Sequence, residues 1–202
     1  IDADITFKYK EVEVPEGDVA FKLSLTGLKG GHSGVDIHLQ RANANKLLFR
    51  FLKVAVAEYD ARLCCFEGGS LRNAIPREAF SAVTVPADGA DDLLELVAEY
   101  ETLFQTEFEG VEDGIKFTAE KTDRVKGLMP EEIQDDLINA VTACPNGVYR
   151  FIPELPDVVE TSNNLAIIRS DGSSITACCL IRSSVESRKE ELASMVESAF
   201  TL

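Results

Sequence analysis

The stretch GLKGGHSGVDIHLQRANANKLLFRFL, residues 27–52, decides the fold because a turn signal leads directly into a helix signal. Four glycines surround His32, and glycine adopts positive φ and permits close backbone approach, so a shaped loop is expected there. Behind the loop, apolar residues recur at helical spacing and predict one buried face: Leu47, Leu48, Phe51, Leu52 and Ala55. The sequence therefore presents a histidine between a strand and an amphipathic helix at about 41–59.

The segments around this stretch carry further strand and helix signals. Apolar and polar residues alternate in 1–14, 21–26 and 115–120, and short β-rich runs occupy 62–67 and 79–85. A second helix is expected after the acidic residues 88–92, with the apolar face Leu93, Leu96, Val97, Tyr100, Leu103 and Phe104. The order β-α-β-β-α-β predicts a ferredoxin-like unit, an antiparallel sheet with two helices on one face.

The second half of the sequence partly repeats this order. Pro130 suits the first turn of a helix that carries Ile133, Leu137 and Val141. Strand-like runs at 165–169 and 174–181 flank Asp171-Gly172, a two-residue hairpin signal. A capping box that starts at Ser187 predicts the last helix. We therefore predict an α+β fold of two tandem ferredoxin-like units, about 17–123 and 124–202, in which the second is truncated or shares a strand.

Composition excludes several classes of function. A formal net charge of −15 repels nucleic-acid phosphates and anionic lipid, and no basic stripe offsets it. The longest apolar runs are too short for a membrane helix. Five cysteines without a C-x-x-C motif indicate reduced core thiols in a cytoplasmic protein. The chain starts at Ile1 without a methionine and without a signal-like leader, which suggests a segment excised from a longer protein.

Three motifs carry a family resemblance: GLKGGHSG from residue 27, DIHLQRANANKLL from residue 36 and GGSLRNAIPREAF from residue 68. With them the chain closely resembles the Xaa-His (aminoacyl-histidine) dipeptidases of the M20 metallopeptidases, over its whole length. The resemblance implies the lid, or dimerisation-type, domain that is inserted in the catalytic domain of such an enzyme. It also implies two zinc ions in the whole enzyme. The motifs that bind them are absent from this chain.

The same resemblance implies roles for three residues. The histidine of the GGHSG motif points into the active-site cleft of M20 enzymes, which implies that His32 stabilises the oxyanion. The asparagine of the second loop reaches the substrate, which implies that Asn73 binds the peptide backbone. A carboxylate-binding arginine in the second half implies Arg182, in the motif IRSSVES, for the substrate's C-terminus. Without the resemblance, His32 and Asn73 could equally be turn residues, and Arg182 could be a solvated arginine at a strand end.

The remaining polar residues are weaker candidates. Arg150 and Arg169 are possible substitutes for Arg182 as the carboxylate ligand. His38 is expected as a helix-start or packing residue, because two histidines do not make a zinc site. The stretch 160–164 (ETSNN) matches a family motif, with no role beyond lining the cleft. The other arginines are expected as surface charges or in ion pairs: Arg41, Arg72 and Arg77.

Two classes of function remain open at this point. The resemblance implies the lid of an enzyme in which zinc-bound hydroxide attacks a dipeptide, so the chain alone is expected to be inactive. Its expected partners are the dipeptide and its own catalytic domain, and a homodimer is left open. The alternative is a non-catalytic ferredoxin-like module for dimerisation or small-ligand binding. A degenerate, inactive M20 relative is a third possibility.

Overall fold

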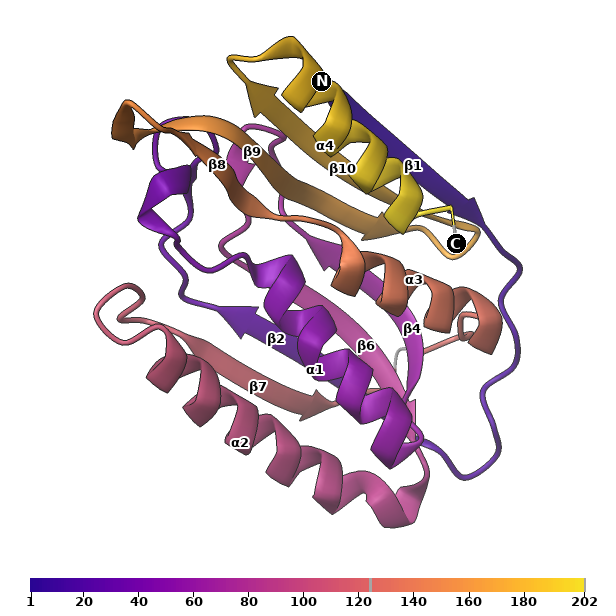
Figure 1. The fold of residues 1–202 in the computed structure, drawn as a ribbon. Coiled ribbons are helices and arrows are strands. Elements are labelled where there is room, and N and C mark those ends of the chain that lie inside the picture. Colours follow the sequence, from indigo (N-terminus) through magenta and orange to yellow (C-terminus); the bar gives the residue numbers. More distant parts are fainter. Residues whose placement is uncertain (124, 202) are drawn as a thin grey trace.

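The computed structural model describes residues 1–123 and 125–201. Four helices, α1 (Ala44–Tyr59), α2 (Ala90–Glu107), α3 (Glu131–Ala143) and α4 (Glu186–Ala199), cover one face of a sheet (Figure 1). The strands of the sheet are β1 (Asp2–Lys8), β2 (Val19–Thr26), β4 (Arg62–Gly68), β6 (Ala79–Val85), β7 (Lys116–Lys121), β8 (Gly147–Ile152), β9 (Leu155–Ser170) and β10 (Ser174–Ser183). Their order is β1-β10-β9-β4-β6-β2-β7, and β8 pairs with β9. The predicted α+β class, with an antiparallel sheet and helices on one face, is confirmed.

The first half of the chain has the ferredoxin-like arrangement. The elements β2, α1, β4, β6, α2 and β7 follow one another, and the strands lie in the order β4-β6-β2-β7 with every pair antiparallel. The apolar face predicted for α1 is buried in full. The face predicted for α2 is buried at four positions, but Leu103 is exposed, because it lies at the edge of the apolar stripe.

The second half extends the same sheet. Strand β9 pairs with β4, so the halves meet edge to edge, and α1 packs against α3 over this junction. The N-terminal strand β1 pairs with β10, from Asp2 opposite Leu180 to Lys8 opposite Ser174. The first strand of the chain therefore lies in the second half of the sheet. The division into tandem units at 17–123 and 124–202 stays a prediction, and its boundary residues Arg124 and Leu202 lie outside the described residues.

Several local predictions were wrong. Helix α1 begins at Ala44 rather than near residue 41, because Asn43 is its N-cap and accepts from the backbone N–H groups of Asn45 and Lys46. The hairpin between β9 and β10 has the three residues 171–173 in its loop, not two. Helix α4 already begins at Glu186, so the proposed capping box falls inside its first turn and caps nothing. Strand β1 ends at Lys8 instead of continuing to residue 14, and β8 was not predicted.

All five cysteines are free thiols. Four of them are buried, as the sequence indicates, but Cys65 is exposed. Cys65 precedes the buried Phe66, so strand alternation turns it to the other face, and the register shift between Leu63 and Cys65 allows both Leu63 and Cys64 to be buried. Within residues 1–123 and 125–201, no helix combines the length and the hydrophobicity that crossing a membrane requires.

Candidate functional site

The two motif loops meet in a small sheet of their own. Strand β3 (Gly31–His32) pairs antiparallel with β5 (Ala74–Ile75), with His32 opposite Ala74. The backbone N–H of Ser33 donates to the carbonyl of Asn73 over 2.8 Å. His32 and Asn73 line one cavity of about 690 Å³, whose wall includes Phe80 and Arg169 of the main sheet. The structure therefore brings two of the three predicted site residues to the same cavity.

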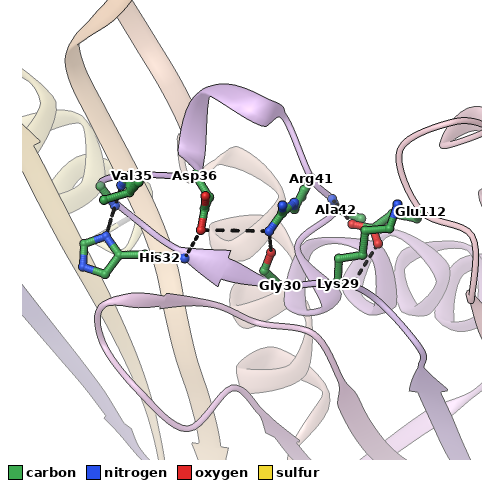
Figure 2. A network of polar contacts seen from close by, with 9 residues as sticks. Lys29, Gly30, His32, Val35, Asp36, Arg41, Ala42 and Glu112 are labelled. Atoms are coloured by element: carbon green, nitrogen blue, oxygen red, sulfur yellow. Dashed lines mark hydrogen bonds and ion pairs between the residues drawn. The ribbon is translucent and has the colours of Figure 1, made fainter.

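The imidazole of His32 is exposed, but backbone contacts fix its orientation. The N–H groups of Gly34 and Val35 donate to its Nδ1 over 3.0 and 3.1 Å (the latter drawn in Figure 2). A backbone N–H can only donate, so Nδ1 must carry a lone pair, and the proton of the neutral ring sits on Nε2. The ring thus offers Nε2–H as a hydrogen-bond donor, which is what stabilisation of an oxyanion requires.

Further contacts fix the backbone that carries His32. The N–H of His32 donates to Oδ2 of Asp36 over 2.8 Å. Arg41 donates from Nη1 to the carbonyl of Gly30 over 2.6 Å, and lies 4.0 Å from the same Asp36 oxygen (Figure 2). Gly31 has φ +143, and a Cβ there would lie 2.7 Å from Arg41 Nη1 and 2.8 Å from Asp36 Oδ2. Residues with a side chain rarely adopt this φ, so the position favours glycine. Arg41 was expected as a surface charge or in an ion pair, and it forms the ion pair.

Glu112 closes this loop, which we name the His32 loop (residues 29–42). Its side chain is 4% exposed and lies between α2 and β7. One oxygen accepts from the N–H of Lys29 over 2.7 Å, and the other accepts from the N–H of Ala42 over 3.0 Å (Figure 2). A single buried carboxylate therefore joins both ends of the loop. Sequence analysis missed it, because Glu112 is one acid among many and lies 70 or more residues from its partners.

Arg182 comes from the other half of the molecule. It lies near the end of β10, opposite Ser162 of β9, and is exposed. A Cβ built on Gly34 would lie 3.2 Å from Cε1 of His32 and 3.4 Å from Nε of Arg182. The two side chains therefore flank the same glycine. No described carboxylate forms an ion pair with Arg182.

The weaker arginine candidates have partners of their own. Arg150 pairs with Glu160 over 3.3 Å, and Arg169 pairs with Glu67 over 2.9 Å. Arg72 pairs with Asp4 over 2.7 Å, as predicted. Arg77 is exposed, as expected of a surface charge.

The second histidine of the chain, His38, was expected at a helix start or in packing. His38 is exposed in a separate turn (Ile37–Leu39), so it neither packs nor starts α1. The prediction for His38 was wrong because the chain makes this turn before the helix begins. Within 1–123 and 125–201, no three His, Cys, Asp or Glu side chains are grouped to hold a metal ion.

Comparison with known proteins finds similarity over nearly the whole chain. Residues 23–112 match the family model of the M20 peptidase dimerisation domain. The chain is 42% identical over 185 residues to a cytosol non-specific dipeptidase of Escherichia coli K12, covering 92% of this chain and 38% of that protein. The crystal structure of an aminoacylhistidine dipeptidase from Vibrio alginolyticus superposes with a TM-score of 0.96 at 43% identity, covering 98% of this chain and 41% of that one. The chain thus spans about two fifths of the length of each relative.

Proposed function

Because residues 23–112 belong to the M20 peptidase dimerisation-domain family, we propose that this chain is the lid of a cytoplasmic metallodipeptidase that hydrolyses Xaa-His and related dipeptides. The observation that carries the proposal is the geometry of His32. Its Nδ1 is occupied by two backbone donors, and its Nε2–H is held at the surface of a rigid loop. A turn residue could make the same two bonds through Nδ1, so the feature that supports the lid role is the unused Nε2–H, exposed beside the cavity that Asn73 also lines.

In this proposal each of three side chains binds a different part of the dipeptide. His32 donates from Nε2–H to the oxygen of the scissile carbonyl as negative charge develops there. The Asn73 amide binds the substrate backbone, since it can both donate and accept. Arg182 binds the C-terminal carboxylate through the two parallel N–H groups of its guanidinium.

The closeness of His32 and Arg182 supports cleavage of the bond before a single free C-terminal residue, as in a dipeptide. In a dipeptide only one residue, about 3.8 Å of backbone, separates the scissile carbonyl from the terminal carboxylate. The groups that recognise these two oxygens must therefore be neighbours. His32 and Arg182 meet this requirement, because both contact the space around Gly34.

The residues of this chain do not fit the metal that the family implies. A catalytic zinc takes about three protein ligands, and the described residues bring no such group together. We therefore place both zinc ions and the attacking water in a part of the parent protein outside this chain, and assign no step to them here.

A dimerisation role is the second candidate, favoured by the description of the matched family. Strands β1 and β7 lie at the two edges of the sheet, and edge strands can pair with a second subunit. At β7 the N–H of Phe117 already donates to Glu101 of α2, so β1 is the better candidate. Such a homodimer is compatible with the lid role. A pure dimerisation module, in contrast, would not depend on His32.

The test is steady-state hydrolysis of an Xaa-His dipeptide by the full-length parent, as wild type, His32→Ala and His38→Ala. Loss of an oxyanion donor should lower kcat about a hundredfold or more in His32→Ala, with unchanged metal content. His38→Ala is the matched control, since it removes an exposed histidine six residues away. If His32→Ala and His38→Ala have the same kcat, His32 is only a turn residue. The isolated chain, supplied with zinc, should remain inactive.

A further inference from the structure

Two adjacent asparagines on β9 point to opposite faces of the sheet. Asn163 and Asn164 are each 1% exposed, and they belong to the stretch whose role the sequence did not reveal. The amide of Asn163 donates to the carbonyl of Pro145, at the end of α3, over 2.6 Å. The amide of Asn164 donates to the carbonyls of Arg72 and Ala74 over 3.2 and 2.8 Å. One asparagine thus stabilises a helix end, and the other contacts the functional site.

The two carbonyls that Asn164 binds lie on either side of Asn73. The carbonyl of Asn73 itself accepts from the N–H of Ser33. Three successive carbonyls, at 72, 73 and 74, therefore accept hydrogen bonds, which restrain the backbone on both sides of Asn73. Ala74 also lies opposite His32 in the β3–β5 pair. The amide of Asn164 consequently supports both the asparagine loop and the strand that carries the histidine.

We propose that Asn164 is a positioning residue, which acts through the backbone of residues 72–74 to aim Asn73 and His32 at the substrate. The inference rests on the function proposed above for these two residues. Asn164 belongs to the second half of the sheet, as does Arg182. The second half therefore contributes a carboxylate ligand and also sets the geometry of the groups that the first half supplies.

The first test measures the positioning itself and needs no enzymatic activity. Asn164→Asp keeps the shape of the side chain but replaces its donor by an acceptor that faces two carbonyls. In the full-length parent, amide hydrogen exchange of the segment 31–35 should become at least about tenfold faster, while α1 keeps its protection. Asn163→Asp is the matched control and should leave exchange of 31–35 unchanged. Unchanged exchange in Asn164→Asp would overturn the proposal.

The second test asks whether Asn164 acts through Asn73. In dipeptide hydrolysis, Asn164→Asp should lower kcat/KM about tenfold or more in the wild-type background, but less than about threefold in the Asn73→Ala background. Asn163→Asp should have the same effect in both backgrounds. If the effects of Asn164→Asp and Asn73→Ala on kcat/KM simply multiply in the double variant, the positioning role is overturned. It is also overturned if Asn164→Asp speeds exchange of 31–35 but leaves the kinetics of hydrolysis unchanged.

Two controls keep the outcomes distinguishable. If Asn164→Asp does not fold, Asn164→Ser retains a single donor, and it should speed exchange of 31–35 by a smaller factor. A Ser variant that exchanges like wild type would contradict the proposal as well. If the wild-type parent hydrolyses no dipeptide, the proposed function fails, while the exchange measurement still decides whether Asn164 holds the loop.

Discussion

The His32 loop and the end of β10 place their functional side chains in different ways. Arg182 lies on a strand in which successive residues are paired with β9, so the register of the sheet sets its position. His32 lies on a loop held by a few individual contacts, from Glu112, Asp36, Arg41 and the backbone N–H groups that reach its ring. A ladder of many bonds tolerates the loss of one. The loop depends on each of its contacts, so single substitutions should affect the two regions unequally.

The largest effect on stability is expected from Glu112→Ala. The substitution leaves the N–H groups of Lys29 and Ala42 without their acceptor in a buried place. Hydrogen bonds to a charged group contribute about 1.5–3 kcal/mol each, so losing both should lower the free energy of unfolding by about 3–6 kcal/mol. Urea unfolding of the chain measures this loss. Glu109→Ala, at an exposed acid of the same turn, should stay within about 0.5 kcal/mol of wild type.

Arg182→Ala should spare stability and weaken substrate binding. The side chain is exposed, so unfolding in urea should hardly change. In the full-length parent, loss of a hydrogen-bonded ion pair with the substrate carboxylate should raise KM about tenfold to a hundredfold, with a smaller effect on kcat.

A C-terminally amidated dipeptide provides the internal control for Arg182. It lacks the carboxylate, so wild type and Arg182→Ala should hydrolyse it at similar rates. Arg50→Ala removes an exposed arginine of α1 that pairs with Glu107 over 2.6 Å, away from the cavity that His32 and Asn73 line, and should leave KM unchanged. If Arg182→Ala has the same KM as wild type, another residue must bind the substrate's C-terminal carboxylate.

A methyl group at Gly34 tests the place where the two regions meet. It would lie 3.2 Å from the ring of His32, which would have to shift by a few tenths of an ångström, and 3.4 Å from Arg182 Nε, at the limit of ordinary van der Waals contact. We expect Gly34→Ala to lower kcat/KM about three- to tenfold and to change stability by less than about 1 kcal/mol. Gly89→Ala meets no atom within 4 Å and is the control. Unchanged kinetics would mean that the two side chains do not act in one site.

The elements that sequence predicted well are those whose pattern is local. The buried face of α1 and the order of elements in the first half follow from apolar periodicity, which a single segment displays in full. The prediction of a capping box at Ser187 was wrong because serine accepts backbone N–H groups in turns as well as at helix starts. Near the start of α4 it is Ser183, not Ser187, that accepts such a bond, from Val185. The pairing of β1 with β10 could not be predicted, because no local sequence pattern indicates a partner strand more than 160 residues away.

The candidate site also depends on contacts between residues that lie far apart in the sequence. The family resemblance pointed to His32, Asn73 and Arg182, but it could not show how they are held. Glu112 and Asn164 contact the site over 70 to 92 residues of sequence, and a glutamate or an asparagine has many ordinary uses. The tautomer of His32 depends on the direction of two backbone N–H groups, which only the folded loop defines.

The smallest effect is expected in the hairpin that joins β9 to β10, in the region that the ladder holds. Asp171 accepts from the backbone N–H groups of Ser173 and Ser174 over 2.9 and 2.7 Å, and these bonds lower its pKa from the ordinary 3.8 to about 2. Because the pKa is lower in the folded state, this stabilisation is complete above about pH 4 and disappears as the pH falls towards 2.

Asp171→Asn should therefore lower Tm at pH 6, by no more than about 4 °C, and should match wild type near pH 2. Thermal melts at both pH values measure the difference, with Asp157→Asn, an exposed acid on β9, as the control. An equal decrease at both pH values would show that the shape of the side chain, rather than its charge, stabilises the turn. In either case dipeptide hydrolysis should be unaffected, because the ladder of β9 and β10, and not their hairpin, sets the position of Arg182.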